Sequence, residues 1–335
     1  MGENRGMSTM RAAIRERYGP PEVVHVVELE RPEPIEDQIL VRVGAASVNR
    51  GDLDGIRAKP SIVRGFMGLR APRNHRIGLD VARTVETAGP NATRFKPGDR
   101  VFADLFNVGQ GSFAEFVAAP ERAFETIPDD WTFEQAATLP HAAILAVQGL
   151  CRRDGRTIQP GERVLVDGAS GNVGPFAIQV AKAFGGEVTG TARTEKLEFV
   201  RSLGADRVID FTAIDYTTTG DRYDWIIDTD SHHPILDVRM ALRPGGTYVT
   251  LGGWLRQIVA AVTIGPVMTA ATGKSAGLML WWKPFAHEDV ETLKRLIGEG
   301  KVTPIIDRRY PLNEIVDALR WVDDGQARGK VIVLP

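Results

Sequence analysis

The chain has 335 residues, enough for two domains and for a large core that needs neither disulfides nor structural metals. Its 41 Lys and Arg residues against 43 Asp and Glu residues give a formal net charge of -2, which leaves no basic excess for binding nucleic acid or an anionic membrane surface. Cys151 is the single cysteine, which excludes an internal disulfide and any zinc or iron–sulfur site built on several cysteines.

The sequence predicts neither a signal peptide nor a membrane-spanning helix. The N-terminal residues carry both charge signs and lack an apolar core of signal-peptide length. The most membrane-like stretch, residues 257–273, contains Gly265 and Pro266 and falls short of the roughly 20 apolar residues that a spanning helix needs. We expect a cytoplasmic protein in which this stretch is buried or lies in an interface.

The first 130 residues are typical of short strands separated by turns. Turn formers such as Gly19-Pro20-Pro21 divide brief apolar runs. These runs cover residues 23–27, 39–43, 81–85 and 113–117. The pattern predicts a largely antiparallel, barrel-like domain.

Residues 131–283 alternate between strand and helix patterns. Strands are expected at residues 164–166, 187–192, 207–210, 225–227 and 247–251, the last after a predicted turn at 243–246. Helical spacing follows the first strand, and a further helix is expected over 196–203. This alternation predicts an α/β domain of the Rossmann type, with a doubly wound parallel sheet.

The remaining residues, 284–335, contain two amphipathic helical patterns and two short strands. The second helix is expected over residues 312–322. The segment is too small to form a core of its own. We therefore predict one domain from residues 1–130 completed by 284–335, with the domain of residues 131–283 inserted into it.

A glycine-rich loop follows the strand at residues 164–166. Gly168 permits a sharp turn, Gly171 allows close approach of a pyrophosphate, and Gly174 lets the next helix pack against the sheet. The helix N-terminus then points its N–H groups at the phosphates. The loop predicts dinucleotide binding. The other predicted cofactor-binding residues are Ser170, Asn172 and Val173 in this loop, and Gly252 and Gly253 after the fifth expected strand.

The end of the second expected strand indicates which nicotinamide cofactor is bound. NAD sites usually place an acidic residue there for the ribose 2′-hydroxyl, whereas this sequence has Arg193, followed by Lys196 in the next helical turn. A guanidinium at this place favours a 2′-phosphate, so we predict NADPH. The alternative is an arginine that is merely solvated at the surface.

Six motifs, taken in order, resemble the medium-chain dehydrogenase/reductase superfamily in its zinc-free, quinone-oxidoreductase-like branch. They are YGPPEV, ASVNRGD, GLDVA, FKPGDRV, GSFAEF and RGKVIV, at residues 18–23, 46–52, 78–82, 95–101, 111–116 and 328–333. The resemblance covers nearly the whole chain. It implies a partly open, GroES-like β-barrel catalytic domain, a Rossmann cofactor domain, a small-molecule substrate and a homodimer joined through edge strands of the cofactor sheets.

The resemblance also implies a metal-free active site. Zinc-dependent relatives use a Cys and a His-Glu pair at positions that are Asn49, Leu79 and Asp80 in this sequence. A leucine cannot bind a metal, and an asparagine is a poor substitute for a thiolate. The adjacent His232 and His233 have no partner at metal-site spacing, so we interpret them as part of a polar loop.

Three residues are candidates for catalysis. The resemblance implies that Asn49 and Asp52 lie near the nicotinamide, where the Asn49 amide could stabilise negative charge on a substrate oxygen. Asp52 could orient Asn49, or it could simply be a turn residue. Asp54 occupies a position where many relatives have a Tyr, and His141 is a candidate replacement as proton donor; a structural histidine is the alternative.

These features predict an NADPH-dependent, zinc-independent reductase that transfers hydride to an activated C=C or C=O bond, as in an enone, an enal or a quinone. Two alternatives stay open. One is an NADP-dependent alcohol dehydrogenase or ketone reductase, and the other is a cofactor-binding protein with little turnover.

Overall fold

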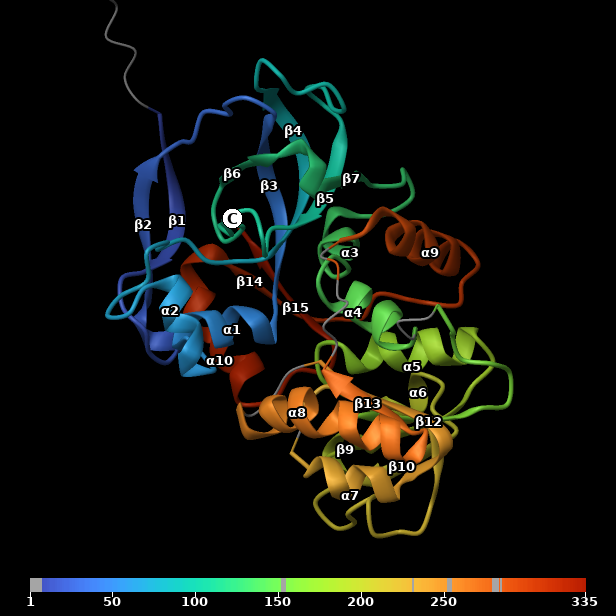
Figure 1. Cartoon of the computed structure of the whole chain (residues 1–335). Helices are drawn as coiled ribbons and strands as arrows, with labels where there is room; N and C mark the ends of the chain where they lie inside the picture. Colours follow the sequence, from blue (N-terminus) through green and yellow to red (C-terminus); the bar gives the residue numbers. More distant parts are fainter. Residues whose placement is uncertain (1–7, 152–154, 231, 252–254, 279–282, 284) are drawn as a thin grey trace, which may run out of the picture. The chain divides into compact units, whose positions relative to one another are not determined.

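The computed structural model describes residues 8–151, 155–230, 232–251, 255–278, 283 and 285–335. The chain divides into two compact units (Figure 1). The first comprises Met1–His141 and Ile306–Pro335, and the second comprises Ala142–Ile305. We describe each unit by itself.

The boundaries of the units differ from the expected ones at residues 130 and 284. Helix α3 (Phe133–Ala137) belongs to the first unit, where the guanidinium of Arg100 lies 5.0 Å from the centre of the Phe133 ring. Helix α9 (His287–Gly298) belongs to the second unit, because it packs on α4 (Ala142–Gly149) and accepts a hydrogen bond there. The side-chain amide of Gln148 donates to Asp289 at 2.5 Å. Tertiary contacts of this kind, which periodicity does not reveal, decide where the units divide.

The first unit is built mainly from antiparallel strands. Its strands are β1 (Thr9–Arg15), β2 (Val24–Glu30), β3 (Gln38–Val48), β4 (Asp80–Ala88), β5 (Arg100–Asp104), β6 (Phe116–Pro120), β7 (Phe124–Thr126), β14 (Ile306–Pro311) and β15 (Lys330–Leu334). Its other helices are α1 (Arg50–Arg57), α2 (Arg64–Met67) and α10 (Ile315–Asp323).

The main sheet of the first unit joins both ends of the chain. Its strand order is β14-β15-β3-β4-β5-β7, with β6 also paired to β3, and the hairpin β1-β2 is attached by isolated bridges. Only β14 and β15 pair in parallel among these described strands. Side chains from β3, β4, β5 and β15 fill the core, including Val41, Val81, Val101 and Val333. The barrel-like, antiparallel architecture predicted for this region is therefore confirmed.

The second unit alternates strands and helices along the chain. Its strands are β8 (Arg163–Asp167), β9 (Glu187–Ala192), β10 (Arg207–Asp210), β11 (Tyr223–Asp228), β12 (Leu242–Thr250) and β13 (Ser275–Leu278). The helices between them, besides α4 and α9, are α5 (Gly174–Ala183), α6 (Leu197–Ser202), α7 (Ile235–Met240) and α8 (Leu255–Thr272).

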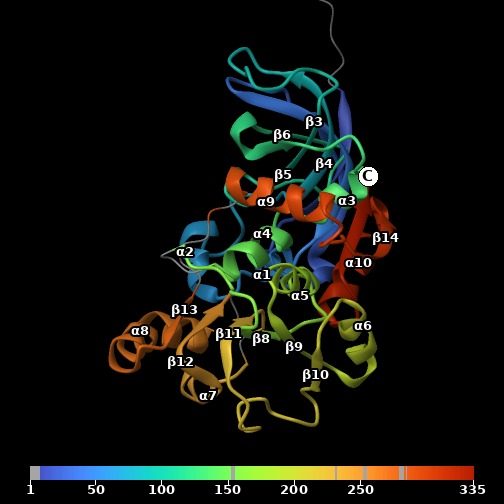
Figure 2. The same cartoon turned by 90° about the vertical axis from the view of Figure 1, so that its right-hand side faces the viewer.

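These strands form the predicted parallel, doubly wound sheet. Figure 2 shows them across the sheet in the order β10-β9-β8-β11-β12-β13, with α6 beside β10 and α8 beside β13. All described neighbours in this sheet pair in parallel. The chain reverses its direction of winding between β8 and β11. In such sheets ligands bind beyond the carboxyl ends of the strands at this point of reversal.

Some strands and turns lie where the sequence predicts them, and others do not. The strands predicted at residues 187–192 and 207–210 are confirmed as β9 and β10. The run at 113–117 was placed too early, because β6 begins at Phe116 and the carbonyl of Phe113 instead accepts from Ala13 in β1. The turn predicted at 243–246 is an irregularity inside β12, where its register with β11 shifts.

Helix α8 occupies the stretch that is most membrane-like in sequence. None of the helices in the described part of the chain is long and apolar enough to cross a membrane. Along α8, Ala261 is buried but Val259, Val262 and Val267 are exposed. The helix thus leaves an apolar face uncovered within the single chain.

Candidate active site

The glycine loop lies between β8 and α5, beyond the carboxyl end of β8. Gly168 has a φ of +77°, a conformation that side chains disfavour. A Cβ on Gly174 would lie 2.4 Å from the carbonyl oxygen of Gly168, so that the loop can close only with glycine there. A Cβ on Gly171 would meet the carbonyl oxygen of Gly168 at 3.5 Å, which is an ordinary van der Waals contact. The loop therefore has the shape expected of a phosphate cradle at the N-terminus of α5.

Hydrogen bonds from neighbouring strands hold the start of this loop. The backbone N–H of Gly168 donates to the hydroxyl of Thr191 at 3.1 Å, and that hydroxyl donates to the carboxylate of Asp167. The hydroxyl of Thr229 donates to the carbonyl oxygen of Asp167 at 2.9 Å. The loop is thus attached to the ends of both strands that flank β8.

Two buried carboxylates that were not predicted from the sequence lie beneath the loop. Asp167 ends β8 and Asp228 ends the neighbouring strand β11, with the two residues paired in register. Asp228 accepts a hydrogen bond from the Tyr248 hydroxyl at 2.9 Å. Burial, and secondly the charge of Asp228, raise the pKa of Asp167 to about 7. Two acidic residues ending adjacent strands at the point of reversal were the signal in the sequence.

The other predicted cofactor residues occupy different environments. Arg193 is exposed and directly follows β9, whose Thr191 carbonyl accepts from Ala169 of the loop at 3.0 Å. Lys196 is buried in the turn after Arg193, so these two cations do not share one exposed surface. Ser170 and Asn172 are half-buried, and Val173 is buried. Gly252 and Gly253 lie outside the described residues.

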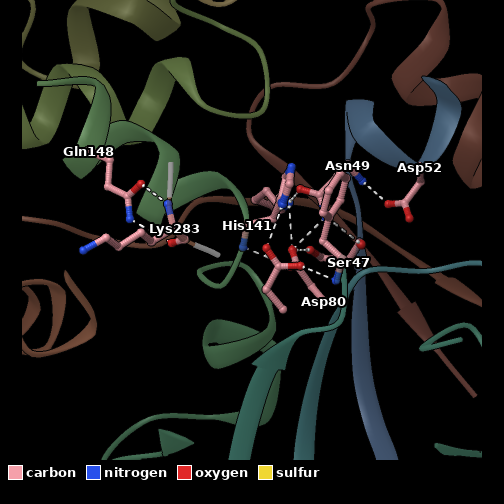
Figure 3. A network of polar contacts seen from close by, with 10 residues as sticks. Ser47, Asn49, Asp52, Asp80, His141, Gln148 and Lys283 are labelled. Carbon is pink, nitrogen blue, oxygen red and sulfur yellow. Dashed lines mark hydrogen bonds and ion pairs between the residues drawn. The ribbon is translucent and has the colours of Figure 1, made fainter. Parts of the chain in front are cut away.

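A second constellation of polar side chains is buried in the first unit (Figure 3). The carboxylate of Asp80 is its centre: one oxygen accepts from the Ser47 hydroxyl at 2.6 Å and from the Asn49 amide at 2.8 Å. The other oxygen accepts from the backbone N–H of His141 at 3.0 Å. We call Ser47, Asn49, Asp80, Asp104, His141 and Lys330 the polar cluster.

Lys330 brings a positive charge into this cluster. Its ammonium donates to the side-chain oxygen of Asn49 at 2.5 Å and lies 3.3 Å from a carboxylate oxygen of Asp80. Both charged side chains are fully buried. Burial lowers the pKa of Lys330 and raises that of Asp80, while their mutual attraction acts against both shifts. Lys330 was not predicted as a site residue, although a lysine at the start of the apolar strand β15 was a signal in the sequence.

Asn49 and Asp52 lie at the start of α1. The backbone N–H of Asn49 donates to Asp52 at 2.8 Å, which closes the first turn of the helix. Both residues are almost completely buried. The Asn49 NH2 group donates to Asp80 at 2.8 Å and to the carbonyl oxygen of Ser47 at 3.4 Å, so its predicted bond to a substrate oxygen would require one of these two contacts to break. Burial raises the pKa of Asp52 to about 7.

His141 is the third candidate, and it faces a carboxylate. Its Nδ1 lies 2.8 Å from Oδ2 of Asp104, the last residue of β5. Burial lowers the pKa of His141, but Asp104, followed by Asp80, outweighs that effect and raises the pKa overall. Asp104 was not predicted from the sequence as the partner of His141.

The residues at the zinc-ligand positions of zinc-dependent relatives make other contacts. Leu79 is an apolar core residue, and the oxygens of Asn49 and Asp80 are already bound to the ammonium of Lys330. Within the described residues, no group of three His, Cys, Asp or Glu side chains is arranged to hold a metal ion. His232 contacts Asp230 at 2.7 Å, and the ring of His233 lies edge-on to Tyr216.

Comparisons with known proteins match both units. Residues 35–129 match the alcohol dehydrogenase GroES-like domain, and residues 203–333 match the zinc-binding dehydrogenase family. The chain is 31% identical to the mitochondrial NAD(P)H oxidoreductase RTN4IP1 of Mus musculus, over 98% of this chain and 92% of that protein. It is 32% identical to the chloroplastic NADPH-dependent alkenal/one oxidoreductase of Arabidopsis thaliana, over 97% of this chain and 80% of that protein.

A solved structure agrees with these matches. The quinone oxidoreductase from Coxiella burnetii superposes with a TM-score of 0.84 and 26% identity, over 98% of this chain and all of that one. The first unit therefore has the GroES-like fold and the second the Rossmann fold. The chain belongs to the medium-chain dehydrogenase/reductase superfamily, in its quinone-oxidoreductase-like branch.

Proposed function

We propose that this protein is an NADPH-dependent, zinc-independent reductase that transfers hydride to an activated C=C or C=O bond of a small molecule. The observation that carries the proposal is the glycine loop at the carboxyl end of β8, with Arg193 directly beyond the adjacent strand β9. The loop would receive the pyrophosphate and the guanidinium of Arg193 the 2′-phosphate. Bound NADPH would supply the hydride.

The relatives support the class of substrate. One is named an alkenal/one oxidoreductase, another a 2-methylene-furan-3-one reductase, and a solved structure is a quinone oxidoreductase. Alkenals, enones and quinones share a double bond conjugated to a carbonyl group. We propose the same class for this chain.

The polar cluster supports zinc independence. A catalytic zinc would require Asn49 and Asp80 to give up the ammonium of Lys330, and Leu79 would contribute no ligand. Polarisation of the substrate is therefore assigned to side chains of the protein.

We also propose a homodimer. Strand β13 is the edge of the described sheet in the second unit, and α8 beside it exposes Val259, Val262 and Val267. A second copy would cover these apolar side chains. The predicted cytoplasmic location stays a prediction, since the names of two relatives place them in mitochondria and chloroplasts.

Binding titrations with NADPH and NADH test the cofactor. We expect the parent protein to prefer NADPH, and Arg193→Ala to weaken NADPH binding about 10- to 100-fold, because a charge-assisted contact to phosphate is lost. NADH binding should change little. Arg201→Ala, which removes an exposed arginine from α6, is the matched control. Equal affinities of the parent protein for the two cofactors would contradict the assignment.

A substrate panel tests the reaction. NADPH consumption is followed with an enone, an enal, a quinone and a simple ketone. Turnover of the conjugated substrates in the presence of a chelator supports the proposal. Tight NADPH binding with no consumption across the panel would favour a cofactor-binding protein with little turnover.

A further inference from the structure

Contacts to both the backbone and the imidazole of His141 restrict this residue. Its backbone N–H donates to Asp80 at 3.0 Å, and its Nδ1 lies 2.8 Å from Asp104. The ring of Phe106 lies roughly parallel to it, with the ring centres 5.9 Å apart. The His141 side chain is about 10% exposed, so little rotational freedom remains. A histidine that merely fills a core needs no such arrangement.

Asp104 is itself fixed, which makes it a precise acceptor. Its side chain is fully buried at the end of β5. One carboxylate oxygen accepts from the backbone N–H of Phe106 at 2.9 Å, and the other faces Nδ1 of His141. Since a carboxylate only accepts, Nδ1 carries the hydrogen, and Nε2 is the ring nitrogen at which a proton is gained or lost.

Glycine leaves space beside Nε2. A Cβ on Gly51, in the first turn of α1, would lie 3.4 Å from Nε2 and 3.2 Å from a methyl carbon of Leu79. Glycine at this position spares Nε2 the contact that a Cβ would make. The geometry of Asp104 and His141 therefore resembles a general acid with its orienting carboxylate.

We propose that His141 is the proton donor of the reduction and that Asp104 is its positioning residue. The inference rests on the proposed function, which it deepens by assigning the proton. Hydride adds to one carbon of the conjugated double bond, and the electron pair of that bond moves to give an enolate. The enolate takes the proton from Nε2 of the imidazolium. His141 is left neutral, with Nδ1–H still donating to Asp104, and it regains a proton from water.

The charged groups around His141 favour its protonated form. Asp104 and Asp80 attract the imidazolium, and the buried ammonium of Lys330 opposes it. The carboxyl group of Asp52 also interacts electrostatically with the ring. Because Asp104 and Asp80 together outweigh burial and Lys330, the pKa of His141 is raised.

The test combines titration of the imidazole by NMR with pH profiles of kcat/KM. In the parent protein we expect His141 to titrate above the ordinary histidine value and kcat/KM to fall as the pH rises through that pKa. Asp104→Asn should lower the pKa of His141 and move the fall in rate to lower pH, because the carboxylate that raises this pKa is lost. Matched controls are His25→Gln and Asp99→Asn, an exposed histidine and a turn carboxylate of the same unit.

Two further variants separate catalysis from packing. His141→Gln should reduce kcat about 100-fold or more and abolish the fall in rate, since general acid catalysis typically contributes that much. Gly51→Ala should reduce kcat while leaving the pKa of His141 unchanged, because it crowds Nε2 without touching Asp104. NADPH affinity should be unchanged in both.

The possible outcomes separate the role of His141 and Asp104, which we call the dyad, from the proposed function. If the parent protein consumes NADPH and the pH profile survives in His141→Gln, the dyad is wrong and the reductase stands. If the parent protein neither binds nor consumes NADPH, the proposed function fails, and with it the role of the dyad. An imidazole pKa that does not respond to Asp104→Asn would overturn the positioning role even in an active enzyme.

Discussion

Two groups of buried carboxylates, one in each unit, are stabilised in opposite ways. In the first unit, Asp80 lies against the ammonium of Lys330, and Asp104 lies against His141. In the second unit, Asp167 and its neighbour Asp228 accept hydrogen bonds from the hydroxyl groups of Thr191 and Tyr248. In the first unit, the negative charge of a buried carboxylate is balanced by a positive charge. In the second unit, that negative charge is reduced by protonation, since the pKa of Asp167 is raised to about 7.

This difference suits what each unit would bind. A site for an anionic cofactor gains nothing from extra buried negative charge, so the raised pKa of Asp167, which lowers its mean charge near pH 7, is favourable there. A site that delivers a proton needs a charged imidazole, and paired carboxylates hold that charge. The polar cluster of the first unit therefore depends on particular side chains, whereas the glycine loop of the second unit depends on the shape of the backbone.

Removing Lys330 eliminates the ion pair with Asp80 and should cause the largest loss of stability among the proposed variants. Lys330→Met leaves Asp80 buried without its cation, which typically costs about 3–5 kcal/mol in the free energy of unfolding. Urea denaturation measures the loss. Lys301→Met, which removes an exposed ion pair with Glu299, should cost less than about 1 kcal/mol. Adding Asp80→Asn to Lys330→Met should recover part of the loss; if it does not, charge balance is not what Lys330 supplies.

The buried carboxyl group of Asp52 should make the stability of the protein depend on pH. Its pKa is raised from 3.8 to about 7 in the folded protein, so the folded state binds more protons than the unfolded state between these values. Stability due to this group is therefore fully present below pH 4 and lost as the pH rises toward 7. At about 1.4 kcal/mol per unit, the loss reaches about 4 kcal/mol at most.

Asp52→Asn keeps an oxygen that accepts from the N–H of Asn49 but cannot ionise. The variant should gain about 2–4 kcal/mol relative to the parent protein between pH 4 and pH 8, measured by denaturation at each pH. Asp317→Asn, at an exposed position on α10, is the control and should show no such gain. A constant difference between Asp52→Asn and the parent protein at every pH would contradict the raised pKa.

What the sequence predicted was local, and what it missed was long-range. Strand β9, strand β10 and the glycine loop follow from periodicity and from residues that are neighbours in the chain. The ammonium of Lys330 contacts Asn49 across 281 positions, and Asp104 contacts His141 across 37. No repeating pattern connects such residues, because the pairing of β15 with β3 and the end of β5 bring them together. His141 was a candidate from its residue type and from the resemblance, whereas its partner Asp104 became evident only in the fold.

Variants of two glycines in the loop test the backbone shape and the ligand binding separately, and they have the smallest expected effects. Gly174→Ala places a Cβ against the backbone of Gly168 and Ala169, so it should lower stability by about 1–3 kcal/mol even without cofactor. Gly171→Ala meets only an ordinary contact, and it should leave stability nearly unchanged. It should nevertheless weaken NADPH binding about tenfold, because its methyl group occupies the space where a pyrophosphate approaches. Thermal unfolding without cofactor and NADPH titration distinguish the two variants, and a Gly171→Ala protein that binds NADPH like the parent would place the phosphates elsewhere on the loop.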